Sequence, residues 1–137
     1  MKILAASHGY FASGIKSSLD ILLGKTEDLI VIDAYLDQQS VEEKLDEFFQ
    51  SVPDTEQVIM LSDLYGGSVN QKMYLRLDRP NTFLIAGMNL ALVLQLLLKN
   101  TPLNHEQLKD MVEESRKALT LVEFESTGKE EKDFWRN

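Results

Sequence analysis

The chain has 137 residues, 44% of them hydrophobic, and a formal net charge of −8. This length suits one domain with a hydrophobic core, and the negative charge argues against nucleic acid and anionic membrane surfaces as partners. Because the sequence has no cysteine, disulfide bonds, thiolate nucleophiles and thiolate metal sites are excluded.

Four short apolar runs are predicted to form buried parallel strands. Each run is continuously apolar rather than alternating, which is typical of a sheet that helices cover on both faces. In chain order the runs are KILAAS (2–7), LIVIDA (29–34), QVIMLS (57–62) and TFLIAG (82–87).

Helical patterns fill the intervals between these runs. The first helix is expected to end at Gly24, a residue type that is frequent at helix C-caps. The second opens with Ser40 and Glu43 in capping-box spacing and ends near Pro53. The apolar stripe of the first helix comprises Phe11, Ile15, Ser18, Leu19, Leu22 and Leu23. The stripe of the second comprises Val41, Leu45, Phe48, Phe49 and Val52.

Three further helices follow the third and fourth runs. Asn89 leads into the segment 90–99, which is apolar almost all round and is interpreted as core, with a dimer face as the second choice. Its most apolar part, 90–98, is about half the length that crosses a bilayer, so we expect no membrane insertion. The helix before it carries Val69, Met73 and Leu77. The helix after it begins near Asn104 and carries Leu108, Met111, Val112 and Leu119.

This order of elements predicts a doubly wound α/β domain. We expect a mostly parallel sheet of four strands in the common order 2-1-3-4, with helices on both faces. The segment LTLVEF (119–124) is compatible with a fifth, antiparallel strand that covers a sheet edge in its own subunit or in a partner. The expected organisation is a single domain over residues 1–125, followed by a polar tail over 126–137.

Two polar segments follow strands that are neighbours in this order. SHGY (7–10) follows the first strand, and SDLYGGS (62–68) follows the third. In open α/β sheets, ligands bind beyond the carboxyl ends of the strands, at the point where the strand order reverses. His8 and Asp63 are therefore predicted to face each other across one crevice.

This pair suggests nucleophilic chemistry on an imidazole. A neutral imidazole attacks through one nitrogen only when the other carries the proton, and a carboxylate that accepts this N–H fixes the tautomer. Gly66, Gly67 and Ser68 add small residues with exposable N–H groups and a hydroxyl at a helix start, which is a typical anion-binding arrangement. Together these residues would hold a phosphoryl group on His8.

Each of these residues also has a purely structural interpretation. A histidine at a strand end is often a packing residue, an aspartate often fixes a turn, and GGS often forms a tight turn. Their coincidence at one predicted crevice favours the functional interpretation, and Gly9 joins the candidate phosphate-binding residues. His105, at a helix start, is interpreted as a surface residue.

Three segments resemble a known family. SHGYFASG (7–14), LSDLYGGSVNQ (61–71) and IAGMNLALVLQLL (85–97) are similar to the IIA domain of the mannose family of the bacterial sugar phosphotransferase system, over roughly residues 1 to 120. The resemblance implies a cytoplasmic phosphocarrier that phospho-HPr phosphorylates on Nε2 of His8 (the tele position). The group then passes to a histidine of a IIB component, which serves a membrane sugar permease. Asp63 matches the family's histidine-orienting aspartate, and Ser68 matches a phosphate-contacting position.

The resemblance has further implications for assembly and specificity. It implies a homodimer whose C-terminal strand crosses to the other subunit, which would give LTLVEF (119–124) a role. The IIB component would be a separate polypeptide, and neither a cofactor nor a metal is expected. Mannose, fructose, sorbose, gluconate and amino-sugar systems all stay open.

Other functions place the same residues in different roles. A receiver domain would use Asp63 as the phosphoryl acceptor, but it would also need an acidic pair after the first strand, where this chain has SHG. A histidine phosphatase would need an arginine before the histidine, at the position of Ser7. A flavodoxin-like binding module without catalytic activity is the third alternative.

Overall fold

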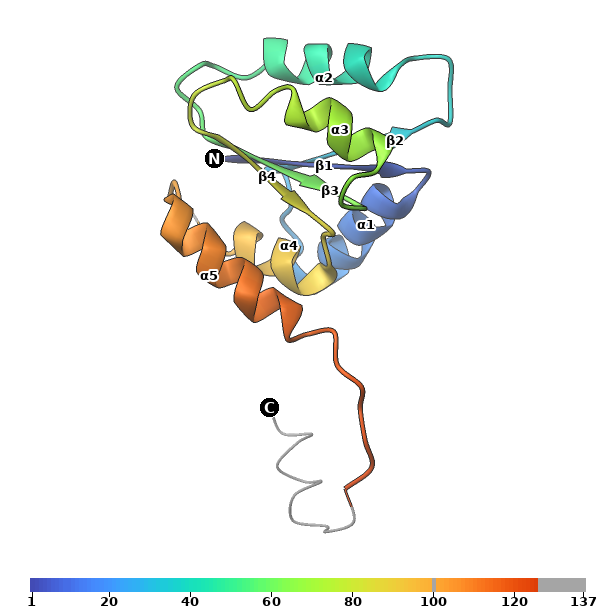
Figure 1. Cartoon of the computed structure of the whole chain (residues 1–137), viewed down its shortest axis with the longest axis vertical. Helices are drawn as coiled ribbons and strands as arrows, with labels where there is room; N and C mark the ends of the chain where they lie inside the picture. Colours follow the sequence, from blue (N-terminus) through green and yellow to red (C-terminus); the bar gives the residue numbers. More distant parts are fainter. Residues whose placement is uncertain (100, 126–137) are drawn as a thin grey trace.

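Four parallel strands form the central sheet of the computed structural model, which describes residues 1–99 and 101–125 (Figure 1). The sheet has the order β2-β1-β3-β4, as predicted. The strands are β1 (Lys2–His8), β2 (Leu29–Ala34), β3 (Val58–Ser62) and β4 (Thr82–Ala86). The register pairs His8 with Ala34 and Ala6 with Ser62, so the carboxyl ends of β1, β2 and β3 meet at one edge of the sheet.

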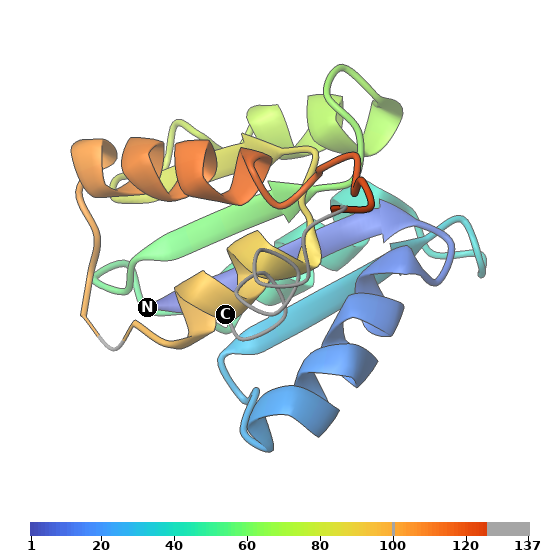
Figure 2. The ribbon, with the colours of Figure 1, turned by 90° about the horizontal axis from the view of Figure 1, so that it is seen from below.

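Helices cover both faces of this sheet, which confirms the doubly wound fold. The helices are α1 (Phe11–Leu23), α2 (Val41–Gln50), α3 (Ser68–Tyr74), α4 (Leu90–Leu97) and α5 (His105–Arg116). In Figure 1, α2 and α3 lie on one face of the sheet and α1, α4 and α5 on the other. Figure 2 views the molecule from the second face. Two separate hydrophobic clusters fill these layers, because each continuous apolar strand buries side chains on both faces.

Local sequence signals set the ends of several helices. Gly24 ends α1 in the left-handed conformation (φ 75°), which glycine adopts without steric penalty. The Ser40 hydroxyl accepts a hydrogen bond from the N–H of Glu43 at the start of α2. Asn104 and Gln107 bond each other reciprocally at the start of α5, which is a complete capping box.

The predicted apolar stripe of α1 is wider than its buried face. Ala12, Ile15 and Leu19 are buried, whereas the predicted stripe residues Phe11 and Leu22 are 49% and 59% exposed. The reason lies in the position of the helix, which runs beside the edge strand β2 (Figure 2). Because α1 lies at the edge of the sheet, the sheet covers only one side of the apolar stripe. The stripe residues on the other side face solvent.

Helices α2, α3 and α5 end earlier than their apolar stripes suggested, and α2 ends at Gln50, before the stripe residue Val52. α3 ends at Tyr74, so Leu77 lies in the turns that follow it, and α5 ends at Arg116, so Leu119 is exposed. In α4, Leu92, Val93 and Leu96 are buried, as expected of a core helix. His105 is exposed at the start of α5, as expected.

The predicted fifth strand is not part of the described sheet. Residues 119–125 lie outside the four strands, and Figure 1 shows the chain leaving the body of the domain after α5. Exchange of this segment between two subunits stays a prediction, and the polar tail over 126–137 lies outside the described residues. Within residues 1–99 and 101–125, none of the helices has the length and apolar character that a bilayer crossing requires.

Candidate functional site

The end of β1 places His8 at the rim of the sheet. His8 is the last residue of the strand, beside Ala34 of β2, and 48% of its side chain is exposed. Gly9 follows in the left-handed region (φ 57°) and donates its N–H to the Ala34 carbonyl, which ends the strand and directs the chain into α1. His8 is therefore fixed by a buried strand and yet reachable from solvent.

Asp63 meets His8 as the strand order predicted. It is the first residue after β3, and its Oδ2 atom lies 2.8 Å from Nδ1 of the His8 ring. The same Oδ2 atom accepts the backbone N–H of His8, also at 2.8 Å. One carboxylate oxygen thus holds both the backbone and the ring of a residue that is 55 positions away in the sequence.

The ionisation of Asp63 fixes the state of the histidine ring. Partial burial alone would raise the pKa of this carboxyl, but the two hydrogen bonds from His8 outweigh burial and hold the pKa below its ordinary value. A carboxylate only accepts hydrogen bonds, so Nδ1 carries the proton in this network. In the neutral ring, Nε2 then keeps its lone pair and is the nucleophilic nitrogen.

Ser68 and Gly67 lie on the other side of the His8 ring. The Ser68 hydroxyl is 3.3 Å from Nε2 of His8, at the first residue of α3. At Gly67, a Cβ atom would lie 3.2 Å from the Leu64 carbonyl and 3.8 Å from Cε1 of His8, so glycine permits this close approach. A hydroxyl donor therefore stands next to the atom where a group on Nε2 would be attached.

The structure supports the predicted phosphate-binding role less clearly for Gly9 and Gly66 than for Gly67 and Ser68. The N–H of Gly9 is bonded to β2, as described above. Gly66 has a positive φ of 78° and forms the turn before α3, and its carbonyl accepts a hydrogen bond from the Gln71 side chain. The structure thus brings Ser68 and Gly67 to His8, while Gly9 and Gly66 shape the loops around it.

Two residues of the site were missed by the sequence analysis. The Tyr35 ring lies 5.2 Å from the His8 ring, centroid to centroid, and its hydroxyl is 2.7 Å from Oγ of Ser68. Nζ of Lys72 is 3.4 Å from the same Tyr35 hydroxyl. The predicted strand order could have identified Tyr35, because the first residue after β2 must lie beside the end of β1, where His8 stands.

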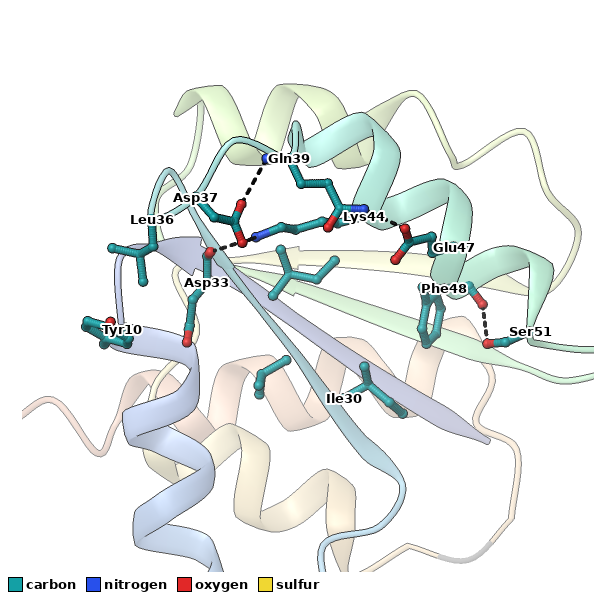
Figure 3. A pocket seen from close by; sticks show the side chains of 12 residues that line it. Tyr10, Ile30, Asp33, Leu36, Asp37, Gln39, Lys44, Glu47, Phe48 and Ser51 are labelled. Carbon is teal, nitrogen blue, oxygen red and sulfur yellow. Dashed lines mark hydrogen bonds and ion pairs between the residues drawn. The ribbon is translucent and has the colours of Figure 1, made fainter.

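A groove of about 700 Å³ lies along β2 and α2, and Tyr10 is among the residues that line it (Figure 3). Nζ of Lys44 reaches across it to Oδ2 of Asp37, at 3.1 Å, and to the Asp33 carbonyl, at 3.3 Å. His8, Asp63 and Ser68 do not line the groove. With 48% of its side chain exposed at the rim, His8 is accessible to a macromolecular partner.

Comparisons with known proteins agree on one family. The profile of EIIA-man, described as the PTS system fructose IIA component, matches residues 2–116. The fructose-specific EIIA component of the PTS system from Bacillus subtilis (strain 168) is 24% identical over 128 residues, which cover 91% of this chain and 85% of that protein.

Solved structures show the same fold. The phosphotransferase system component EIIA from Streptococcus agalactiae is 26% identical, with a TM-score of 0.72 over 88% of this chain and 95% of that one. The mannose/sorbose specific IIA subunit from Enterococcus faecalis is 20% identical, with a TM-score of 0.81 over 92% of this chain and 97% of that one. At this identity, the second likeness concerns the fold alone.

Proposed function

This chain belongs to the EIIA-man family of IIA components of the sugar phosphotransferase system, and on that premise we propose that it carries a phosphoryl group on Nε2 of His8. The donor is the phospho-form of HPr, and the acceptor is a histidine of a IIB component. That component serves a membrane permease, so the protein acts in the cytoplasm and contributes to sugar uptake indirectly.

The observation that carries this proposal is the contact between His8 and Asp63. Their 2.8 Å hydrogen bond leaves Nε2 as the free nitrogen of a half-exposed ring. A histidine held in one tautomer by a partly buried carboxylate is prepared for attack through its other nitrogen. Oδ2 of Asp63 accepts two hydrogen bonds from His8, and Oδ1 is buried, which disfavours the receiver-like alternative in which Asp63 itself accepts the phosphoryl group.

The transfer step exchanges one phosphorus–nitrogen bond for another. Nε2 of His8 attacks phosphorus in line, its lone pair forms the new bond, and the donor histidine leaves with the electron pair of the bond that breaks. The proton on Nδ1 stays in place, and the ring gains positive charge beside the Asp63 carboxylate. Transfer to the IIB histidine reverses these roles, so the carrier returns to its starting state.

Ser68 lies where its hydroxyl can bond an oxygen of the phosphoryl group carried on His8. Its hydroxyl is 3.3 Å from Nε2, so a small rotation directs the O–H from the nitrogen to an oxygen of the bound phosphoryl group. The backbone N–H groups that begin α3 have no acceptor within the helix, which leaves them available near the same position. Ser68 is therefore a catalytic residue in this proposal, together with His8.

The surroundings of the rim suit protein partners. Tyr10, Leu64 and Tyr65 are 72%, 62% and 85% exposed, although each is a large apolar or aromatic side chain. They stand in the loops that carry His8 and Asp63, where a docking protein would cover them. The net charge of −8 further favours partners with a basic docking face. A homodimer is part of the proposal, and the sugar remains open among the systems named above.

One reconstituted reaction tests the function. The purified chain is incubated with labelled phosphoenolpyruvate, Enzyme I and HPr, and the modified residue is mapped by mass spectrometry. We expect one label, on His8, that is lost in acid and kept in base, as a phosphohistidine should be. His8→Ala should abolish labelling, whereas His105→Ala, at the other histidine of the chain, should leave it unchanged.

The alternatives give different results in the same experiment. An acyl phosphate on Asp63 would be lost in base and would establish the receiver-like function. A folded chain that takes up no label would be a binding module. Either outcome would overturn the proposal.

A further inference from the structure

Tyr35 adopts a backbone conformation that disfavours its side chain. It is the first residue after β2 and has a φ of 68°, in the left-handed region. A bulky residue in this region is an energetically unfavourable outlier, and such outliers are often found at functional sites. The conformation directs its ring to 5.2 Å from the His8 ring, centroid to centroid, although 51% of the residue stays exposed. Burial in the core therefore does not explain why the strained conformation is kept.

The polar atoms around Tyr35 form one continuous chain with a fixed direction. Because Nε2 of His8 has no proton, the Ser68 hydroxyl donates to it. The Ser68 oxygen then accepts from the Tyr35 hydroxyl at 2.7 Å. The Tyr35 oxygen accepts in turn from the ammonium of Lys72 at 3.4 Å, because an ammonium group can only donate.

Lys72 is held at the outer end of this chain by two further contacts. Its Nζ lies 3.3 Å from Oε1 of Glu42 and 5.4 Å from the centroid of the Tyr35 ring. The hydrogen bond to Tyr35, followed by that to Glu42, raises the pKa of the Lys72 ammonium. A permanent cation therefore stands two hydrogen bonds from the Ser68 oxygen and polarises the Tyr35 hydroxyl toward it.

From this geometry we propose that Tyr35 and Lys72 are positioning residues for phosphoryl transfer to His8, acting through the Ser68 hydroxyl. The Tyr35 hydroxyl donates to the Ser68 oxygen and keeps it in place while the Ser68 O–H turns from Nε2 of His8 to an oxygen of the incoming group. The Lys72 ammonium in turn donates to the Tyr35 hydroxyl and keeps Tyr35 in position. The inference rests on the proposed function. It assigns two residues outside the predicted site to the same step, and no bond to either residue forms or breaks.

The decisive experiment is a double-mutant cycle between Tyr35 and Ser68. Single-turnover transfer from phospho-HPr is measured for the wild type, Tyr35→Phe, Ser68→Ala and the double variant. Tyr35→Phe keeps the ring and removes only the hydroxyl. We expect it to slow transfer at saturating donor about tenfold, the effect of losing one hydrogen bond. The donor concentration for half-maximal rate should stay the same.

The cycle separates positioning from a purely structural role. Because Tyr35 acts through Ser68, Tyr35→Phe should have almost no further effect in the Ser68→Ala background. The inference would be overturned if Tyr35→Phe slowed transfer equally in the wild-type and Ser68→Ala backgrounds, or if it left the rate unchanged. It would also be overturned if Tyr35→Phe changed only the phospho-HPr concentration for half-maximal rate. Tyr74→Phe, at an exposed tyrosine of α3, is the matched control and should transfer at the wild-type rate.

Lys72 is tested by the same assay. Lys72→Met keeps much of the side-chain length and removes the charge, and we expect transfer to slow about threefold, with no effect in the Tyr35→Phe background. A rate equal to that of the wild type would remove Lys72 from the proposal. Failure of the wild type to label His8 at all would overturn the proposed function itself, so the two failures are distinguishable.

Discussion

The two ends of the sheet hold their polar side chains in different ways. At the amino end, Gln57 is only 2% exposed, and its amide bonds both the N–H and the carbonyl of Leu103, at 2.8 and 2.7 Å. At the carboxyl end, bonds between side chains link His8, Asp63 and Ser68, and much of this network is exposed. The first arrangement joins two segments of backbone, and the second arranges reactive groups.

The same contrast appears in the backbone. Among residues 1–99 and 101–125, only Asn81 and Tyr35 combine a positive φ with a side chain, at 55° and 68°. Asn81 precedes the amino end of β4 and is of a type that tolerates this region, whereas Tyr35 follows the carboxyl end of β2 and is not. The amino end thus uses residues suited to their local structure, whereas the rim keeps a strained residue where chemistry is proposed.

The largest expected effect is on the chemistry of the rim. Asp63→Asn keeps the size of the side chain but removes the charge that stabilises the His8 ring as it gains a bond on Nε2. We expect phosphoryl transfer to fall about a hundredfold, within the range of positioned acid–base groups. Rapid-quench measurement of transfer from phospho-HPr checks this result. Asp110→Asn, on the exposed side of α5, should leave the rate unchanged.

If Asp63→Asn transferred at the wild-type rate, the Asp63 carboxylate would be a structural group like the Gln57 amide, without a role in the chemistry.

The second effect concerns stability at the amino end. Gln57→Leu leaves the N–H and carbonyl of Leu103 buried without their partner, which lowers the free energy of unfolding by about 2–4 kcal/mol. Urea denaturation checks the loss, with the exposed Gln38→Leu as the matched control. The folded fraction of the Gln57→Leu variant should still transfer phosphoryl groups at the wild-type rate. A slowed rate in fully folded protein would show that the two ends are coupled.

The smallest effect is the dependence of stability on pH. The folded-state pKa of Asp63 lies below its unfolded value, so its contribution to stability is complete above about pH 4 and disappears as the pH falls through the folded-state pKa. The wild type should therefore lose more stability than Asp63→Asn as the pH is lowered below 4. Urea unfolding of both proteins at matched pH values measures the difference. Equal losses would mean that the bonds from His8 do not depend on the charge of the carboxylate.

The fold was predictable because the strands are continuous apolar runs with clear ends. The run 29–34 coincides with β2, and the strand order then brought His8 and Asp63 together without any knowledge of side-chain positions. The amphipathic stripe of α1 was a poorer guide. The stripe predicted the helix correctly but overestimated how many of its residues are buried, because burial also depends on which part of the sheet the helix covers.

The contact between Tyr35 and Ser68 was not predictable in the same way. It depends on the left-handed conformation of a residue type that rarely adopts it, and on the path of the loop after β2. Strand order could place Tyr35 near His8, but it could not show that the hydroxyl reaches Ser68. Side-chain contacts of this kind follow from coordinates and not from residue patterns.

The double contact of Asp63 with His8 has a consequence for the entropy of the encounter with a partner. Because Oδ2 of Asp63 accepts hydrogen bonds from both the ring and the backbone N–H of His8, the side-chain torsions of His8 are restricted before any partner binds. Immobilising a side chain on binding otherwise costs about 0.5–1.5 kcal/mol. The free protein already meets this requirement, so each docking partner finds the nucleophile in one orientation, whether it delivers the group or removes it.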